Sequence, residues 1–377
     1  MDFFYNIWNF GGIHILTYFA VMSVIVFVHE LGHFLMGRWC GVKIDAFSLG
    51  LGPELFGFDD RHGTHWRVAA FPLGGYVKFH GDANGASVPD SEAMAQMPAA
   101  EKSVTLAGQK VWKRAAIVAA GPLANFLLTI AIFSGMYMYY GQDELLPHVG
   151  TVIQGSAAET AGFKKGDIVV AMDGRAINSW QEMTAAILNS ANKPLAVEVE
   201  RAGARLELTA TPRVEFDNGI AKSRLGLGPA LTDADFRYTS VGVVDAIGLG
   251  GLETWHWVQQ TGTSLRQLIL GKASLDQVSG PPGIAQALGE VAKHAPDRLI
   301  KIIAILSLSI GLFNLLPVPL LDGGHLMFYA FEALRGRPLQ DRVQEYGFRF
   351  GMLLVGSLLV FVVSNDFWKI LHSAGWM

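Results

Sequence analysis

His29, Glu30 and His33 stand in the order His-Glu-x-x-His. Residues four apart lie one turn apart on one face of an α-helix, so both imidazoles can bind the same metal ion. Glu30 leaves that face, and its carboxylate can instead reach a water molecule at the metal. The three residues therefore predict a zinc site, with His29 and His33 as ligands and Glu30 as the base that deprotonates water.

The surroundings of this box argue against a chance match. Residues 13–28 contain no Asp, Glu, Lys or Arg, and the apolar run from Ile13 to Gly37 includes the box. Ionisable side chains inside a membrane are costly, and they generally face a cavity, a partner or an ion. We therefore expect the box to lie within a transmembrane helix and to hold a metal.

The composition agrees with a membrane location. Of the 377 residues, 51% are hydrophobic and 16% are charged, and the mean hydropathy is +0.31. The net charge of -4 gives no indication of nucleic-acid binding. Cys40 is the single cysteine, which excludes a disulfide within the chain. These values predict a polytopic membrane protein with a soluble part.

Four apolar runs are long enough, or nearly so, to cross a bilayer as helices. The first is expected to be a retained span rather than a signal peptide, because no basic segment precedes it. The sequence thus predicts a polytopic α-helical membrane protein with four transmembrane helices. The runs are Ile13–Gly37, Ala115–Tyr140, Ile302–Leu321 and Phe350–Asn365.

Basic residues indicate the orientation of these runs. Lys and Arg gather in the connectors 38–114 and 335–349, whereas residues 1–12 contain none. The positive-inside rule places both connectors in the cytoplasm and the segment 141–300 outside it. His29 and His33 then lie near the cytoplasmic end of the first span, so a third ligand should come from a similar depth.

The third run ends at that same cytoplasmic side, in a segment rich in Pro and Gly. Asp322 is the acidic residue near this end, and we favour it as the third zinc ligand. Two alternatives remain from the residues alone. Asp322 could cap the helix that follows Gly323, and His325 could be a further ligand or an interfacial residue.

Two other stretches are expected to border the site. Residues 68–79 are apolar and strand-like, broken at Pro72 and at Gly74 and Gly75, which suggests a membrane-associated β-hairpin or loop. Its edge could pair with an extended substrate, or it could merely pack on the helices. Asn125, at the entry of the second run, could orient the zinc site or donate to an oxyanion. A helix-packing hydrogen bond is the alternative.

The chain is expected to divide into four parts. Residues 1–144 hold the first two spans, residues 145–229 a soluble β-rich domain, residues 230–300 an amphipathic segment on the outer membrane surface, and residues 301–377 the last two spans. Within the soluble domain, a capping box predicts a helix from Ser179 to about Leu188. Leu195–Arg201 and Ala204–Ala210 predict a pair of strands.

Together these stretches resemble the site-2 protease family of intramembrane zinc metalloproteases, specifically the bacterial regulator-of-sigma-E protease group. The resemblance covers nearly the whole chain. The resemblance rests on three motifs: HELGH at 29–33, GPLAN at 121–125 and NLLPVPLLDGGH at 314–325. Supporting matches lie at 48–53, 71–79, 112–115 and 280–285. The run SAAETAGFKKGD at 156–167 is similar to a PDZ domain. Many relatives carry two PDZ domains, whereas this chain has room for one.

The resemblance implies roles for individual residues. It implies that His29, His33 and Asp322 bind zinc, that Glu30 is the catalytic base and that Asn125 supports the site. It also implies that substrate contacts Asn314, Pro317 and the loop 71–79, which contains Gly74, Gly75, Tyr76 and Val77.

The implied function is that of a Zn²⁺-dependent endopeptidase of a bacterial inner membrane. Its site would face the cytoplasm and its PDZ domain the outside. Substrates would be transmembrane segments of single-pass proteins, such as anti-sigma factors or signal-peptide remnants, cut first by a site-1-type protease. Membrane lipid is the other expected partner, and no nucleic acid is expected. The alternative is a non-catalytic scaffold with a PDZ tail-binding module, whose structural metal would need four protein ligands.

Overall fold

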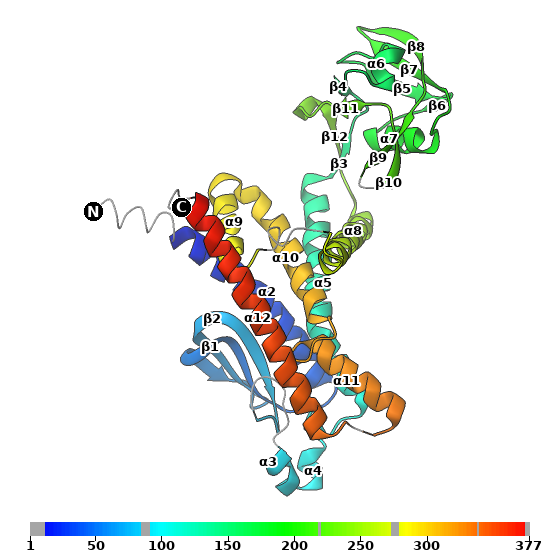
Figure 1. The fold of residues 1–377 in the computed structure, drawn as a ribbon. Coiled ribbons are helices and arrows are strands. Elements are labelled where there is room, and N and C mark those ends of the chain that lie inside the picture. Colours follow the sequence, from blue (N-terminus) through cyan, green and yellow to red (C-terminus); the bar gives the residue numbers. More distant parts are fainter. Residues whose placement is uncertain (1–11, 84–90, 218–219, 273–278, 338, 374–377) are drawn as a thin grey trace, which may run out of the picture. The chain divides into compact units, whose positions relative to one another are not determined.

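The computed structural model describes residues 12–83, 91–217, 220–272, 279–337 and 339–373. The chain forms two compact units (Figure 1). One, the helical unit, comprises residues 1–134 and 247–377, and the other, the β-rich unit, comprises Gly135–Ala246. The expected boundaries 145–229 for the soluble domain fall inside the β-rich unit.

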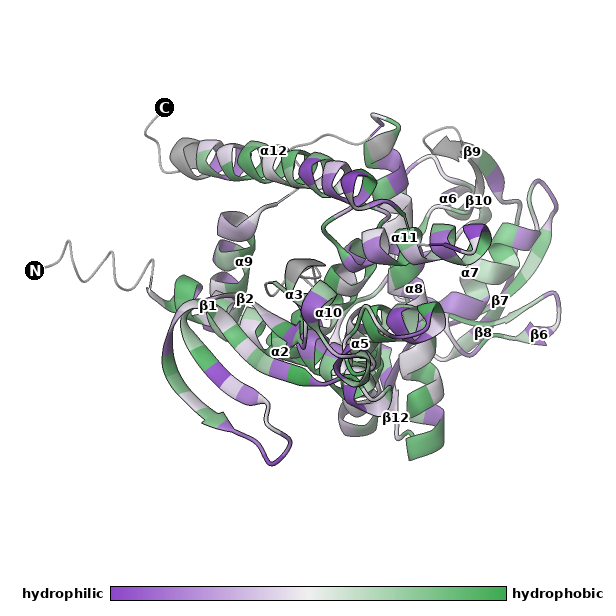
Figure 2. Ribbon diagram, turned by 90° about the horizontal axis from the view of Figure 1, so that it is seen from below, coloured by the Kyte–Doolittle hydropathy of each residue, from purple (hydrophilic) through white to green (hydrophobic). Residues whose placement is uncertain are grey.

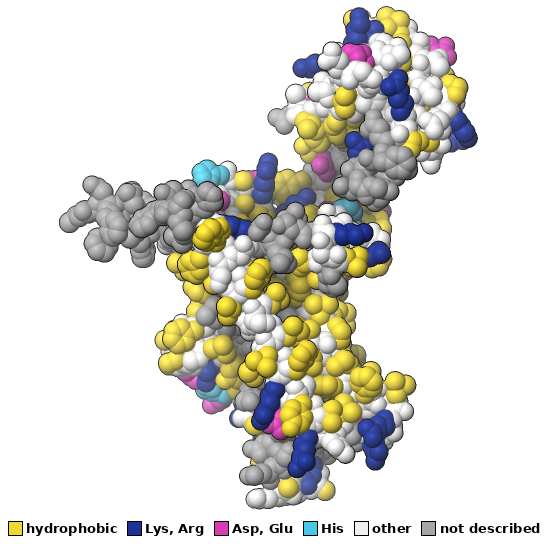
Figure 3. Space-filling model, in the orientation of Figure 1, with side chains coloured by type: hydrophobic (Ala, Val, Ile, Leu, Met, Phe, Trp, Pro, Cys, Tyr) yellow, Lys and Arg dark blue, Asp and Glu magenta, His cyan; other side chains and the backbone are white. Residues whose placement is uncertain are grey.

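Three helices among the described residues are long and apolar enough to cross a membrane. They are α2 (Ile13–Trp39), α5 (Val111–Tyr140) and α12 (Asp341–Ser373). In Figure 3, hydrophobic side chains spread over the visible face of the helical unit, and Lys and Arg side chains lie toward its ends. Leu353 and Val360 of α12, for example, are 74% and 67% exposed. Such an apolar surface suits contact with lipid.

The third predicted run is helical over only part of its length. Helix α10 (Leu299–Asn314) has 16 residues, and the backbone from Leu315 to Leu321 is irregular. Proline has no N–H to continue a helix, and it disfavours helical backbone at the residue before it. Pro317 and Pro319 therefore explain why the helix stops before Leu321. A count of four membrane spans stays a prediction.

Residues 44–79 form a sheet from two long, folded strands. Strand β1 (Ile44–Asp59) pairs with β2 (His65–Phe79), and the chain reverses at residues 60–64. The expected break at Pro72 to Gly75 is a second reversal, within β2, where Gly74 has a φ of +97°. Residues 65–68 run in the same direction as residues 46–49 of β1, and residues 75–78 run opposite to them on the other side, so the two arms of β2 flank β1. Figure 2 shows apolar residues along both strands. Leu55, Phe56 and Phe71 are all more than half exposed.

Two of the remaining helices of the helical unit, α9 and α10, pack against α2. Helix α9 (Pro281–His294) buries Leu288 against Val21 and Ile25 of α2. It therefore buries part of its surface within the protein, whereas the whole segment 230–300 was expected on the membrane surface. The other elements are α3 (Ser91–Gln96), α4 (Ala99–Lys102), α8 (Val243–Ile269), η4 (Pro296–Arg298) and α11 (Asp322–Arg335).

The close approach of α2 and α5 depends on glycine. A Cβ at Gly32 would lie 2.3 Å from the carbonyl oxygen of Ala120 and 2.8 Å from the Cβ of Ala124. Only a residue without a side chain fits at this contact, because such distances are well inside van der Waals separation. Gly32 therefore allows the helix that carries the two histidines to lie directly against α5.

The β-rich unit has its own core, which includes Met183, Val197 and Val199. Two expectations are confirmed here. Helix α7 (Trp180–Asn189) has Ser179 as its N-cap, and β7 (Leu195–Arg201) pairs with β8 (Ala204–Ala210). The other elements are β3 (Gln142–Leu145), β4 (Val149–Val152), α6 (Ala157–Ala161), β5 (Ile168–Met172), β6 (Arg175–Ala176), β9 (Arg213–Asp217), β10 (Ile220–Arg224), β11 (Leu227–Pro229), η2 (Asp233–Asp235) and β12 (Phe236–Thr239).

Candidate metal centre and active site

The structure brings His29, His33 and Asp322 together, although 289 residues separate His33 from Asp322 in the sequence (322 − 33). The Nε2 atoms of His29 and His33 are 3.2 Å apart. The Asp322 carboxylate oxygens lie 3.1 Å from the first nitrogen and 3.6 Å from the second. Among the described residues, this is the group of three or more His, Cys, Asp or Glu side chains that could share a metal ion.

These separations fit a tetrahedral zinc ion. Ligand atoms at about 2.0–2.2 Å from a tetrahedral zinc lie roughly 3.3 Å from one another, and the observed distances of 3.1–3.6 Å bracket that value. Two imidazole nitrogens and a carboxylate are also a donor set that zinc prefers. The residues present therefore fit zinc, with three protein ligands and a fourth position open.

The hydrogen bonds behind His33 leave its Nε2 available for a metal. Its Nδ1 lies 2.9 Å from the carbonyl oxygen of Ile117 on α5. A carbonyl only accepts, so Nδ1 carries the proton and Nε2 has a lone pair directed at the centre of the triangle. Ile117 is fully buried, which keeps water from competing for this contact.

Asn125 occupies the corresponding place behind His29. Its amide nitrogen Nδ2 lies 3.3 Å from Nδ1 of His29, its amide oxygen has no hydrogen-bond partner in the described part of the chain, and the residue is fully buried. A half-turn of the amide would bring the oxygen to the ring, where it would accept the Nδ1 proton and free Nε2 for a metal. The backbone carbonyl of Asn125 accepts from Thr129 and from Ser307 of α10, which ties the residue to two helices. Asn125 thus lies where the sequence predicted a residue that orients the site.

Asp322 is the first residue of α11, and the N-cap position is occupied by Leu321. The carboxylate turns toward the histidines, so the alternative of a helix cap does not hold. Close packing fixes this geometry: a Cβ at Gly323 would lie 2.2 Å from the carbonyl oxygen of Leu316, and one at Gly324 would lie 2.4 Å from that of Val318. The preceding Leu320 has a φ of +114°, a strained backbone of the kind that gathers at functional sites.

A cavity of about 190 Å³ lies beside the three metal-binding side chains. Glu30 lines it together with Val77 of β2. Asn314 lines the cavity as well, whereas Pro317 is exposed and lies outside its wall. The full lining is His29, Glu30, His33, Val77, Phe79, Val118, Asn314, Leu320, Leu321, Asp322 and His325.

The segment 75–79 of β2 forms an edge of the sheet next to this cavity. Residues 46–49 of β1 have partners on both sides, because Phe47 lies opposite both Val77 and Trp66. Within the described residues, 75–79 pair only with β1. Gly75 faces α2, since a Cβ there would lie 3.1 Å from Cγ of Glu30. Of the predicted residues, Gly75, Tyr76 and Val77 therefore belong to the strand segment that borders Glu30, and Gly74 directly precedes it.

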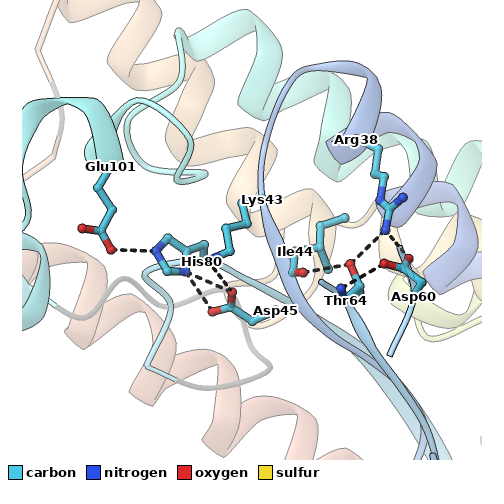
Figure 4. A network of polar contacts seen from close by, with 8 residues as sticks. All are labelled: Arg38, Lys43, Ile44, Asp45, Asp60, Thr64, His80 and Glu101. Atoms are coloured by element: carbon cyan, nitrogen blue, oxygen red, sulfur yellow. Dashed lines mark hydrogen bonds and ion pairs between the residues drawn. The ribbon is translucent and has the colours of Figure 1, made fainter. Parts of the chain in front are cut away.

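Polar contacts hold this sheet in place (Figure 4). On one side Arg38 of α2 pairs with Asp60, and Thr64 donates to the carbonyl of Ile44. On the other side His80 lies between two carboxylates, 3.0 Å from Asp45 and 3.0 Å from Glu101 of α4. These contacts tie the start of β1 to α2 and to α4.

Sequence reasoning did not find Ile117 or Val118. Ile117 acts through its backbone carbonyl, which every residue type has, so no sequence signal identified it. Val118 contributes apolar surface to the cavity, as do many residues of an apolar helix.

Comparisons with known proteins agree with this site. The model of peptidase family M50 matches residues 17–358. The "Putative zinc metalloprotease Atu1380" of Agrobacterium fabrum is 45% identical over 358 residues, which cover 94% of this chain and 95% of that protein. Metalloprotease MmpA of Caulobacter vibrioides is 38% identical over 373 residues, covering 92% of this chain and 93% of that protein.

Solved structures match a smaller part of the chain. The PDZ domain of an SdrC-like protein from Listeria monocytogenes is 17% identical, covering 22% of this chain and 84% of that domain, with a TM-score of 0.20. The HtrA3 PDZ domain is 23% identical, covering 19% of this chain and 78% of that domain, with a TM-score of 0.17.

The match to the family model extends over most of the sequence, and the two relatives are similar over nearly their full lengths. The predicted enzyme class, cofactor and family are therefore confirmed. This chain belongs to peptidase family M50 and is a zinc metalloendopeptidase of the membrane.

Proposed function

We propose that the protein cleaves peptide bonds within transmembrane segments of single-pass membrane proteins. The observation that carries the proposal is the location of the metal-binding triad. His29 and His33 lie in α2, an apolar helix of 27 residues, and α5, which fixes His33 through Ile117, is also apolar and 30 residues long. A hydrolytic site at that depth meets membrane-embedded chain more readily than soluble protein.

His29, His33 and Asp322 hold zinc in this proposal, and Glu30 is the base. When bound, zinc lowers the pKa of a water molecule and polarises the carbonyl that is attacked. The Glu30 carboxylate takes a proton from the attacking water and delivers it to the nitrogen of the cleaved bond. Glu30 and Val77 line the same cavity, so the carboxylate lies beside the edge strand. Asn314, which lines the cavity, is proposed to contact substrate, as is Pro317.

An extended substrate is proposed to lie along the edge strand 75–79. A helical substrate hides its peptide bonds behind intrahelical hydrogen bonds, so it must unwind before attack. An edge strand supplies N–H and C=O groups to the unwound segment, and the edge borders Glu30. Gly74, Gly75, Tyr76 and Val77 are thus assigned to substrate binding.

In this proposal the zinc lies toward the cytoplasm of a bacterial inner membrane, the chain has four spans and the PDZ domain is extracytoplasmic; the basic connectors support this orientation. Anti-sigma factors or signal-peptide remnants, trimmed beforehand by a site-1-type protease, are the proposed substrates. The non-catalytic alternative fits the site less well. A structural zinc would be closed by four protein ligands, whereas three residues converge here beside a cavity that contains a carboxylate.

Glu30→Gln tests this function, because the amide keeps the shape of the side chain and removes the base. The purified variant should hold one zinc per chain, as the wild type does. Its cleavage of a single-pass model substrate in detergent should fall by at least about 10²-fold. Turnover within a few-fold of the wild type would contradict the role of Glu30, and cleavage of soluble peptides alone would contradict the membrane substrate.

A further inference from the structure

His325 is a polar residue of the cavity that the reaction described above does not use. It lies one turn after Asp322 on α11 and lines the same cavity as Glu30. The spacing 322, 325, 329 and 332 places four side chains on one helix face. Both ends of this series are anchored, by Asp322 at the histidines and by Glu332, which pairs with Arg114 of α5. His325 is therefore held toward the site.

Aromatic neighbours fix the plane of the His325 ring. Its centroid lies 5.3 Å from that of Phe348 on α12 and 6.4 Å from that of Tyr329. Arg114 in turn lies over the Tyr329 ring, 4.9 Å from its centroid. These contacts hold the imidazole by its faces and edges and leave its nitrogens to other partners.

The nitrogens of His325 have no hydrogen-bond partner among the described residues. The other nitrogen-bearing side chains of the cavity are engaged. His29 and His33 direct Nε2 at the metal position, and the Asn314 amide donates to the carbonyl of Ile310. A half-buried imidazole that faces a cavity without a partner calls for an explanation. A neutral imidazole always has one N–H to donate.

His325 is not a fourth ligand. The donor atoms of the metal group, all within 4.8 Å of one another, come from His29, His33 and Asp322. A catalytic zinc site keeps its fourth position for water or substrate. A donor close to that position, but outside the group, can instead contact the substrate atom on which charge develops.

We propose that His325 is a further catalytic residue, which donates a hydrogen bond to the scissile carbonyl oxygen as that oxygen becomes an oxyanion. Water adds to the carbonyl carbon, the proton it loses passes through Glu30 to the amide nitrogen, and the C–N bond breaks. His325 keeps its own proton throughout and stabilises the negative oxygen. Loss of one such donor typically slows catalysis by about 10²–10³-fold. This inference rests on the proposed function.

Three variants test it. His325→Phe keeps the aromatic contacts and removes the donor, His325→Gln restores an N–H donor, and the exposed His62→Phe is the matched control. Zinc content should stay at the wild-type level in all three. With a single-pass model substrate, kcat of His325→Phe should fall about 10²-fold, while KM stays within about threefold of the wild-type value. The kcat of His325→Gln should be roughly tenfold higher than that of His325→Phe.

Binding gives a second readout that does not depend on turnover. A phosphinic peptide copied from the cleavage site of the model substrate carries a tetrahedral anionic group in place of the amide. His325→Phe should weaken its binding about 10²-fold. In a Glu30→Gln background, the same change should leave the affinity for the uncleaved substrate within about threefold.

Other outcomes overturn the proposal. Zinc loss in both His325→Phe and His325→Gln would make the residue structural or a ligand. A rise in KM with kcat unchanged would restrict it to ground-state binding, and unchanged kinetics would give it no role in the reaction. If Glu30→Gln is inactive while His325→Phe is as active as the control, only the inference about His325 fails. Activity in Glu30→Gln would instead contradict the proposed function.

Discussion

Gly121 of α5 faces Nε2 of His33, the nitrogen proposed to bind zinc: a Cβ built at Gly121 would lie 2.2 Å from it. The same helix holds His33 from its other side, because the carbonyl of Ile117, four residues earlier, lies 2.9 Å from Nδ1. Helix α5 thus determines both the tautomer of this ligand and the space around its lone pair. The identity of one glycine becomes a condition for metal binding.

Gly121→Ala should therefore lose zinc while the protein still folds. The added methyl group must displace the His33 ring, whereas alanine favours the helix itself by roughly 1 kcal/mol over glycine. We expect zinc content well below one ion per chain and loss of cleavage, measured by metal analysis and a model-substrate assay. Gly135→Ala on the same helix is the matched control, because nothing lies within 4 Å of its Cβ. Stoichiometric zinc in Gly121→Ala would contradict the geometry.

A second glycine, Gly75, allows the role of Glu30 to be tested separately from zinc binding. A Cβ at Gly75 would lie 3.1 Å from Cγ of Glu30 and 3.0 Å from Cγ1 of Val26. Gly75→Ala should push the Glu30 side chain away and slow cleavage by about tenfold or more, with zinc content unchanged. Loss of zinc together with activity would mean that the sheet, and not only Glu30, moves. Comparison with Gly121→Ala distinguishes the two effects.

Much of this site could be predicted from the sequence, since His29 and His33 are close in the chain and helical spacing alone places them on one face. Asp322 could be predicted only from the depth and side of its apolar run, and the residues alone did not exclude a helix cap. The contributions of Ile117 and Gly121 to the geometry of His33 could not be predicted from the sequence. One acts through a backbone carbonyl and the other through the absence of a side chain, so both depend on how two helices approach.

The fold shows the same division. The helix that begins after Ser179 and the strand pair that includes Val197 were predicted correctly, because caps and alternation are local signals. The break at Pro72 to Gly75 was also predicted correctly, because the chain turns back there. The sequence did not show that the two arms flank β1: the pairing of Phe47 with both Trp66 and Val77 is a non-local property.

Asp82, which follows the sheet, is expected to make the stability of the folded protein depend on pH. Burial raises the pKa of its carboxyl group to about 8, and the residue is 6% exposed. The folded state therefore binds more protons than the unfolded state between the ordinary pKa near 4 and pH 8, so stability falls as pH rises through that window. Asp82→Asn removes the group that ionises. It should raise the Tm at pH 8 and change it little at pH 4.

The measurement is thermal unfolding of the purified protein in detergent at both pH values. The exposed Asp297→Asn is the control, because it removes one carboxylate without burial. An equal rise in Tm for Asp297→Asn and Asp82→Asn would attribute the effect to net charge. A fall in Tm at pH 8 for Asp82→Asn alone would show that the ionised carboxylate stabilises the fold.

Strand addition at the edge 75–79 predicts a pattern that repeats every second residue of the substrate. Along a strand, the N–H groups point alternately toward and away from the neighbouring strand. A proline removes a ladder hydrogen bond only where the N–H points toward the neighbour. Single prolines placed at successive substrate positions on one side of the scissile bond should therefore inhibit cleavage at alternate positions.

A substrate that is bound through its side chains, or that is attacked as a helix, would not give this alternation. Proline also unwinds helices. If unwinding were its only effect, cleavage would become faster without a regular alternation between successive proline positions. The experiment measures initial cleavage rates for six consecutive proline variants of one model substrate, with alanine at the same positions as the control. Rates that alternate for proline and stay level for alanine are expected. A smooth dependence on distance from the scissile bond would rule out pairing with residues 75–79, while the assignment of zinc ligands and base would stand, because those rest on His29, His33, Asp322 and Glu30.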